Sequence, residues 1–80
     1  MPKVNLWSGL RRLADGNEVV EVEADNVAQV LDALVRAHPR LAPAIEAGTS
    51  VMVNGEVSVS RFTPVAPDSE IYLLQQLKGG

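Results

Sequence analysis

The sequence predicts an α+β domain in which one main helix packs across a mixed sheet of four or five strands. Three observations lead to this prediction: an apolar stripe at helical spacing lies in the middle of the chain, short alternating segments flank it, and the last such segment lies near the C-terminus. The 80 residues are 46% hydrophobic and 21% charged, which suits one folded unit. We expect a single domain over residues 1–80, with residues 75–80 as a flexible tail.

The elements before the main helix are predicted from periodicity. Residues 4–7, VNLW, alternate in character and predict a first strand. Residues 9–16 carry leucines at helical spacing and predict a short helix with Ser8 as its N-cap. Residues 18–24, EVVEVEA, alternate apolar and acidic side chains, which predicts a second strand near the first, with its acidic face in water.

The main helix has the clearest pattern in the chain. Its apolar stripe consists of Val27, Val30, Leu31, Leu34 and Val35. Asp25 precedes the stripe and is expected to cap the helix. We expect the helix to end at His38, because a residue that precedes proline is pushed out of helical dihedral angles. A weaker helical turn is predicted over residues 41–48.

The second half of the chain reads as a hairpin followed by a last strand. Asn54-Gly55 is a strong signal for a two-residue hairpin turn, and it lies between apolar segments at 50–53 and 56–59. A proline-containing loop then leads to residues 70–74, EIYLL, which predict the last strand. The sheet is thus expected to end only a few residues before the diglycine.

Composition excludes several classes of function. The formal net charge of −3 and the pI near 4.9 oppose binding to nucleic acid. The chain has no cysteine, so it can form neither a disulfide nor a thiolate metal site, and we expect it in the cytoplasm. No apolar run approaches the roughly 18 residues that span a bilayer, so no membrane association is expected.

No residue pattern predicts catalysis by this chain alone. The single histidine, His38, lies at a helix end and is interpreted as a partner of the helix dipole rather than a general base. It has no clustered carboxylates with which to bind a metal. The serine and threonine hydroxyls occur in no nucleophile motif. We therefore expect neither an intrinsic active site nor a bound cofactor or metal.

The sequence ends in LKGG, and the chemistry of a terminal diglycine offers a function. A carboxylate that is activated and then displaced in a narrow active site needs an unhindered neighbour. Glycine has no side chain and permits unusual dihedral angles, so Gly79-Gly80 can thread into a partner where a β-carbon would clash.

Taken in order, the segments VNLW, LRRLADG, DNVAQVLDALVRAHP, VMVNGE and SEIYLLQQLKGG resemble the MoaD/ThiS family of ubiquitin-like sulfur carriers. The resemblance covers nearly the whole chain and implies a β-grasp fold. The short helix after the first strand is closer to the MoaD side, the small subunit of molybdopterin synthase. The sequence departs from the family at Gln75-Gln76, where many members have two prolines.

The resemblance implies a carrier that is a protein substrate rather than an enzyme. An E1-like adenylyltransferase of the MoeB/ThiF type would use ATP and magnesium to adenylate the Gly80 carboxylate. A sulfurtransferase or a sulfide source would then supply sulfur to form a thiocarboxylate. A downstream synthase, such as the large subunit of molybdopterin synthase, would take the sulfur. Molybdopterin, thiamin, cysteine or a secondary metabolite could be the product.

The resemblance also indicates which residues meet these partners. Gly80 and Gly79 would carry the sulfur, and the preceding tail residues Gln75, Gln76, Leu77 and Lys78 would contact the partner. Trp7, Phe62 and Leu74 are the candidates for a docking surface, because exposed aromatic residues form hot spots. Trp7 fits a docking or a core position equally well, whereas Tyr72 is expected in the core.

Two other classes of function stay open. A ubiquitin-like modifier would use the activated Gly80 to form isopeptide bonds to lysines. A β-grasp interaction module would have no use for its tail, and deletion of Gly79 and Gly80 would leave its function unchanged.

Overall fold

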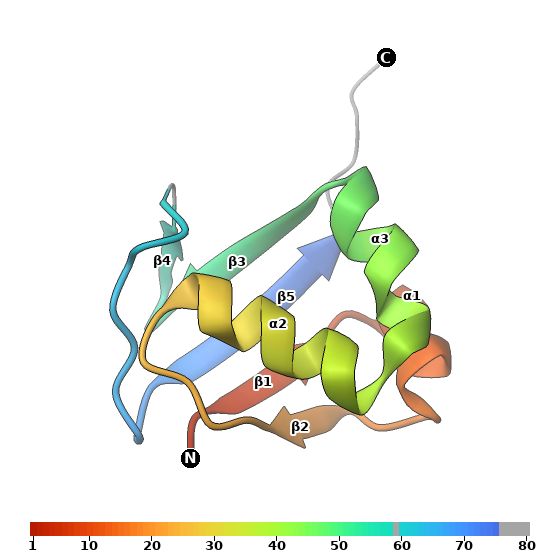
Figure 1. Cartoon of the computed structure of the whole chain (residues 1–80), viewed down its shortest axis with the longest axis horizontal. Helices are drawn as coiled ribbons and strands as arrows, with labels where there is room; N and C mark the ends of the chain where they lie inside the picture. Colours follow the sequence, from red (N-terminus) through yellow and green to blue (C-terminus); the bar gives the residue numbers. More distant parts are fainter. Residues whose placement is uncertain (59, 76–80) are drawn as a thin grey trace.

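The computed structural model describes residues 1–58 and 60–75, and for Gln75 the backbone alone. The strands are β1 (Lys3–Leu6), β2 (Val19–Glu21), β3 (Thr49–Val53), β4 (Glu56–Ser58) and β5 (Glu70–Gln75). The helices are α1 (Ser8–Arg11), α2 (Val27–Ala37) and α3 (Ala42–Ala47), with 3₁₀ turns η1 (Arg12–Ala14) and η2 (Pro39–Leu41). Figure 1 shows α2 lying across one face of the sheet. The predicted α+β fold is confirmed.

The sheet has five strands in the order β2-β1-β5-β3-β4. The first and last strands, β1 and β5, run parallel, while the other neighbours are antiparallel. Strand β5, which comes last in the described sequence, therefore occupies the central position of the mixed sheet. Strand β5 extends through Gln75, one residue beyond the range that alternation predicted. Gln75, the first residue of the predicted tail, is therefore part of the sheet, which corrects that boundary. Residues 76–80 of the predicted tail lie outside the described residues.

The core lies between the sheet and the helices. Alternate residues of the two central strands are fully buried: Val4 and Leu6 on β1, and Ile71 and Leu73 on β5. Four residues of the predicted α2 stripe cover them, with Val27, Val30 and Leu34 buried and Leu31 packed at the edge. The fifth, Val35, is half-buried and lies outside the core cluster. Burial of this one sheet face drives the fold. We call it the covered face and the opposite one the open face.

Helix α2 ends where proline predicts and begins one residue later than expected. His38 is its C-terminal cap, directly before Pro39. The N-cap is Asn26 rather than Asp25, because the Asn26 side-chain oxygen accepts a hydrogen bond of 2.9 Å from the Gln29 backbone N–H. The Gln29 side chain in turn accepts from the Asp25 backbone N–H at 2.8 Å. This reciprocal pair resembles a capping box.

Two further boundaries differ from the sequence prediction. Ser8 is the first residue of α1 rather than its N-cap, and Trp7 takes the cap position without a side-chain hydrogen bond. The second strand is three residues long instead of the predicted 18–24, although the Val22 N–H still donates to the Pro2 carbonyl at 3.1 Å. The alternation of apolar and acidic residues continues beyond the hydrogen-bonded pairs of β1 and β2, so it predicted a strand that is too long.

The β3–β4 hairpin forms as predicted. Asn54 and Gly55 both have positive φ, 51° and 86°, which is the left-handed pair that a tight two-residue hairpin turn requires. The Asn54 side-chain oxygen also accepts a hydrogen bond from the Glu70 N–H at 2.9 Å, so the turn is tied to the start of β5. Strand β4 ends at Ser58, and Val59 of the predicted range lies outside the described residues.

Candidate functional site

Strand β5 links the centre of the fold to the C-terminal segment. It pairs with β1 over four residues and with β3 over five, up to the pair of Gln75 with Thr49. The sheet thus holds the chain on both sides until residue 75. Residues 76–80 therefore follow directly from a strand that is paired on both sides. The predicted sulfur-carrying residues Gly79 and Gly80, and the tail contacts Gln76, Leu77 and Lys78, lie outside the described residues.

The open face of the sheet carries a row of side chains across all five strands. The register places Val19, Asn5, Tyr72, Met52 and Val57 side by side, one from each strand. Val19, Tyr72 and Val57 are 43%, 41% and 60% exposed. Four of the five side chains are largely apolar, and Figure 1 shows α2 across the opposite, covered face of the sheet. Asn5 and Met52 are half-buried, so the exposed apolar side chains of the row are Val19, Tyr72 and Val57. Exposed apolar side chains gathered on one face are typical of a protein-binding surface.

A groove of about 420 Å³ lies at the end of this face where β5 ends. It is lined by Asn5, Leu6, Trp7, Ser8, Arg11, Glu18, Tyr72 and Leu74. The predicted docking residues Trp7 and Leu74 therefore meet at one site, whereas Phe62 is not part of the groove. Phe62 lies after β4, so β5, β3 and β4 separate it from Trp7 in the sheet order.

Backbone contacts hold Trp7 at the rim of the groove. Its N–H donates to the Leu73 carbonyl at 3.0 Å, which extends the β1–β5 ladder by one residue. Its carbonyl accepts from the Leu10 N–H at 2.8 Å, at the start of α1. The residue is nevertheless 51% exposed, so its indole is available for contact. The structure places Trp7 in the half-exposed position that suits docking, while its role in docking stays a prediction.

Arg11 supplies a fixed positive charge beside Trp7. Its Nε donates to the Leu6 carbonyl at 3.2 Å, and one terminal nitrogen lies 3.1 Å from the Glu18 carboxylate. The Arg11 and Glu18 side chains are 40% and 70% exposed, so this ion pair adds little to stability. Its main effect is to orient the guanidinium within a groove whose apolar side chains are Leu6, Trp7, Tyr72 and Leu74.

Tyr72 corrects the sequence prediction. It was expected in the core, but it lies on the open face, because Ile71 and Leu73 take the two buried positions of β5. Asn5 was also missed as a groove residue; its side-chain amide donates to the Ile71 carbonyl at 3.1 Å. The positions of Tyr72 and Asn5 on the open face can be predicted only when the register between β1 and β5 is known.

The remaining polar groups give no sign of a catalytic or metal centre. His38 lies with Nδ1 3.5 Å from an Asp15 carboxylate oxygen at the end of α2, with the His38 side chain largely buried and the Asp15 side chain exposed. Within residues 1–58 and 60–75, no three His, Cys, Asp or Glu side chains are grouped so as to hold a metal ion. In the same part of the chain, none of the helices has the length and apolar character to cross a membrane.

The strand order, the covering helix and the central last strand define a ubiquitin-like β-grasp protein. The model of the ThiS family matches residues 4–80, and the chain therefore belongs to this family of ubiquitin-like sulfur carriers. The match runs through Gly79 and Gly80. No curated protein sequence matches the chain.

Solved structures agree with this assignment. SAMP1, the small archaeal modifier protein 1 of Haloferax volcanii, is 30% identical with a TM-score of 0.77, over 99% of this chain and 98% of that one. A chain of the Amycolatopsis orientalis BexX/CysO complex is 22% identical, with a TM-score of 0.80 and full coverage of both chains. A putative molybdopterin converting factor subunit 1 from Pyrococcus furiosus is 19% identical, with a TM-score of 0.81 over 95% and 97% of the two chains.

Proposed function

We propose that this chain carries sulfur as a thiocarboxylate on Gly80. The observation that carries the proposal is the ThiS family match, which extends through Gly79 and Gly80. The fold supports it, because the central strand β5 delivers these residues from the end of the sheet beside an exposed groove. In this role the chain is the substrate of other enzymes and performs no chemistry by itself.

The proposed reaction has two steps at the Gly80 carboxyl carbon. First, a carboxylate oxygen attacks the α-phosphorus of ATP, and pyrophosphate leaves to give an acyl-adenylate. Second, a sulfide ion attacks the activated carbonyl carbon, and AMP leaves to give the thiocarboxylate. Where the donor is the persulfide of a sulfurtransferase, the same attack first gives an acyl disulfide. A thiol reductant then cleaves its S–S bond, which leaves the thiocarboxylate on Gly80 and the donor cysteine in a disulfide. ATP and magnesium would bind to the E1-like adenylyltransferase, and a sulfurtransferase or free sulfide would be the donor. This chain has no cysteine, so its carboxyl carbon is the place where it can hold the sulfur covalently.

We further propose that the activating enzyme docks on the groove and the adjoining open face. Trp7, Tyr72 and Leu74 would supply apolar contacts, and Arg11 would face a carboxylate of the enzyme. Residues 76–80, if fully extended, can span at most about 17 Å. A partner docked on the groove could therefore take Gly80 into an active site at that distance, without any change in the folded sheet.

The acceptor of the sulfur would be a downstream synthase in the cytoplasm. The family resemblance leaves molybdopterin, thiamin, cysteine and a secondary metabolite as the alternative products. A molybdopterin synthase-type complex would count this chain as its small subunit. Gln75 and Gln76 stand where two prolines would stiffen the segment, so the fit to that synthase is the least supported of these alternatives.

The proposal is tested by mass spectrometry of the intact protein after incubation with host extract, ATP and sulfide. The expected result is the exchange of one oxygen for sulfur. Because this exchange has nearly the nominal mass of an oxidised methionine, and the chain contains Met1 and Met52, fragment ions must place it on Gly80. Omission of ATP and deletion of Gly79-Gly80 are the two controls. A tail that stays unmodified in an extract that charges a known carrier would refute the proposal.

A ubiquitin-like modifier is the second candidate, favoured by the 30% identity to SAMP1 of Haloferax volcanii. It would use the same adenylate, but a lysine amine would attack the carbonyl carbon and release AMP. Trypsin cleaves after Lys78, so each conjugate would leave Gly79-Gly80 on the modified lysine. Finding such branched peptides in cells would support the modifier function. If a thiocarboxylate is found and no branched peptides are, only the sulfur-carrier function remains supported.

A further inference from the structure

Phe62 is a large apolar side chain that neither the core nor the groove uses. It is 83% exposed, more than any other large hydrophobic residue in the described part of the chain. An aromatic side chain in water gains most when a second surface covers it. The exposure of Phe62 therefore points to a second surface that covers it.

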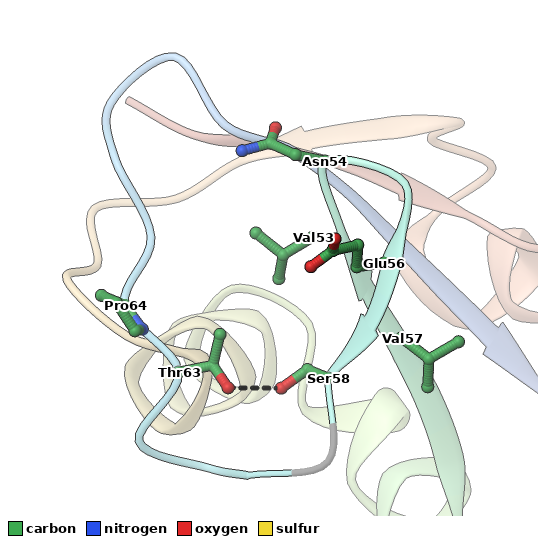
Figure 2. A pocket seen from close by; sticks show the side chains of 7 residues that line it. All are labelled: Val53, Asn54, Glu56, Val57, Ser58, Thr63 and Pro64. Atoms are coloured by element: carbon green, nitrogen blue, oxygen red, sulfur yellow. Dashed lines mark hydrogen bonds between the residues drawn. The ribbon is translucent and has the colours of Figure 1, made fainter.

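The turn that presents Phe62 is held by its own hydrogen bonds. The Phe62 N–H donates to the Ser60 hydroxyl oxygen at 3.1 Å, and the Thr63 N–H donates to the Ser60 carbonyl at 3.3 Å. The Ser58 hydroxyl contacts the Thr63 hydroxyl at 2.9 Å, as Figure 2 shows. These contacts fix the backbone on both sides of the phenyl ring, so little order has to be imposed when it binds.

The same turn is anchored to the main helix. The carbonyls of Arg61 and Thr63 accept hydrogen bonds from the backbone N–H groups of Ala28 and Val27, at 2.9 and 3.0 Å. These two donors belong to the first turn of α2, where no partner exists within the helix. Backbone hydrogen bonds thus tie the turn to the start of α2, and Phe62 is exposed on it.

A hollow lies next to this turn, between it and the β3–β4 hairpin. It measures about 470 Å³ and is lined by Val53, Asn54, Glu56, Val57, Ser58, Thr63 and Pro64. In Figure 2, the side chains of Val53 and Glu56 point towards Pro64 and Thr63 across the hollow. Thr63, the residue that follows Phe62 in the chain, forms part of its wall. A projecting apolar side chain thus lies beside a cavity with apolar surface.

The charges around the two features are opposite. Arg61 precedes Phe62, and Glu56 lines the hollow; both are exposed. Among the described residues, neither of them takes part in an ion pair, since the pairs found are Arg11–Glu18 and Asp15–His38. A surface that inserts Phe62 into such a hollow brings a guanidinium next to a carboxylate.

We propose that this surface binds a second copy of the same chain about a two-fold axis. Phe62 of each copy enters the hollow of the other, and Arg61 of each copy pairs with Glu56 of the other. Phe62 and the hollow lie on the same side of the molecule. A two-fold axis therefore repeats the Phe62 contact and the Arg61–Glu56 contact once in each direction, and no further copy can be added at this interface. The groove and β5 stay free, although Val57 belongs both to the hollow and to the open-face row, so this association goes beyond the carrier function and does not depend on it.

Sedimentation velocity of the full chain, from low micromolar to about 1 mM protein, tests the proposal. We expect the mass to rise from 8.6 kDa towards twice that value. Phe62→Ala should weaken association by at least about tenfold, because each dimer loses two buried rings. Tyr72→Ala, a matched truncation of an exposed aromatic on the open face, should leave it unchanged. A single 8.6 kDa species at every concentration would overturn the proposal.

A charge exchange tests the orientation. Glu56→Arg and Arg61→Glu should each weaken association, because each creates two contacts of like charge, and the double variant should restore it. Failure of the double variant to recover would overturn the two-fold arrangement, and so would loss of association in Tyr72→Ala. Deletion of Gly79-Gly80 must leave association intact, although it abolishes the proposed carrier function, so the two proposals fail separately.

Discussion

Replacement of Trp7 by alanine should separate docking from folding. The residue is 51% exposed, and a large aromatic side chain buries about 150–250 Å² when fully covered, so about 100 Å² is left for a partner. At about 25 cal/mol per Å², covering this area contributes about 2.5 kcal/mol to the complex. The variant should therefore lose about 60-fold in kcat/KM for activation.

The folded domain should survive this change. The buried half of Trp7 contributes at most a similar 2.5 kcal/mol to folding, because area estimates are upper bounds. A domain of 80 residues has a free energy of unfolding of about 4–12 kcal/mol. Trp7→Ala should therefore melt at a lower temperature, with a cooperative transition still present.

Internal competition gives the sharpest assay. Isotope-labelled wild type and unlabelled variant are mixed in one reaction with extract, ATP and sulfide, and the early ratio of their thiocarboxylates equals the ratio of their kcat/KM values. Ile45→Ala is the control, since Ile45 packs against the core from α3 and lies outside the groove. Equal charging of folded Trp7→Ala and wild type would refute docking at the groove, and an unfolded variant would make Trp7 a core residue.

Four further changes test the chemistry and the fold. Gly80→Ala should slow charging on the order of 100-fold in the same competition, because a β-carbon displaces the reacting carboxylate, and an unchanged rate would contradict the narrow-site argument. Leu73→Ala should lower the free energy of unfolding in urea by about 2–5 kcal/mol, since this side chain is fully buried on the central strand; a loss below 1 kcal/mol would contradict its place in the core. Asn26→Ala should cost about 1 kcal/mol by the same measurement, through loss of the helix cap, whereas Asp25→Ala should cost less. Gly55→Ala should cost about 1 kcal/mol, because φ is 86° there although the space beside it is empty, and a stabilised variant would show that the turn has a different conformation.

Local chemistry explains which elements the sequence predicted well. Asn54 and Gly55 both tolerate positive φ, so the hairpin followed from two residues alone. Pro39 fixed the end of α2 through its steric effect on His38. In both cases the deciding interaction lies within a few residues of the pattern that predicts it.

The positions that depend on neighbouring strands were harder to predict. Every second residue of EIYLL is apolar on either face, so alternation could not decide whether Ile71 and Leu73 or Tyr72 and Leu74 face the core. The tyrosine took the open face because the register with β1 buries the other pair. A central strand with apolar residues on both faces gives no periodic signal of its own orientation.

The groove could be predicted only in part, because its residues come from separate elements. Trp7 and Leu74 were expected to act together, and they line one groove at the end of β5. Arg11 and Glu18 were not expected there, since their pair forms across the turn between α1 and β2. Ser8 was assigned as a cap because of its residue type, although helix α1 is only four residues long and begins with Ser8 itself.

The parallel pairing of β1 with β5 has a consequence for synthesis. The Asn5 side chain bonds to the carbonyl of Ile71, 66 residues further along, and the centre of the sheet is empty until β5 has been made. Contacts between residues so far apart in sequence slow folding, because a long loop must close before they form. A nascent chain on the ribosome therefore has no complete sheet until its last strand emerges. An incomplete chain lacks that strand and leaves the facing edges of β1 and β3 unpaired, so it is exposed to proteolysis and aggregation until β5 is added.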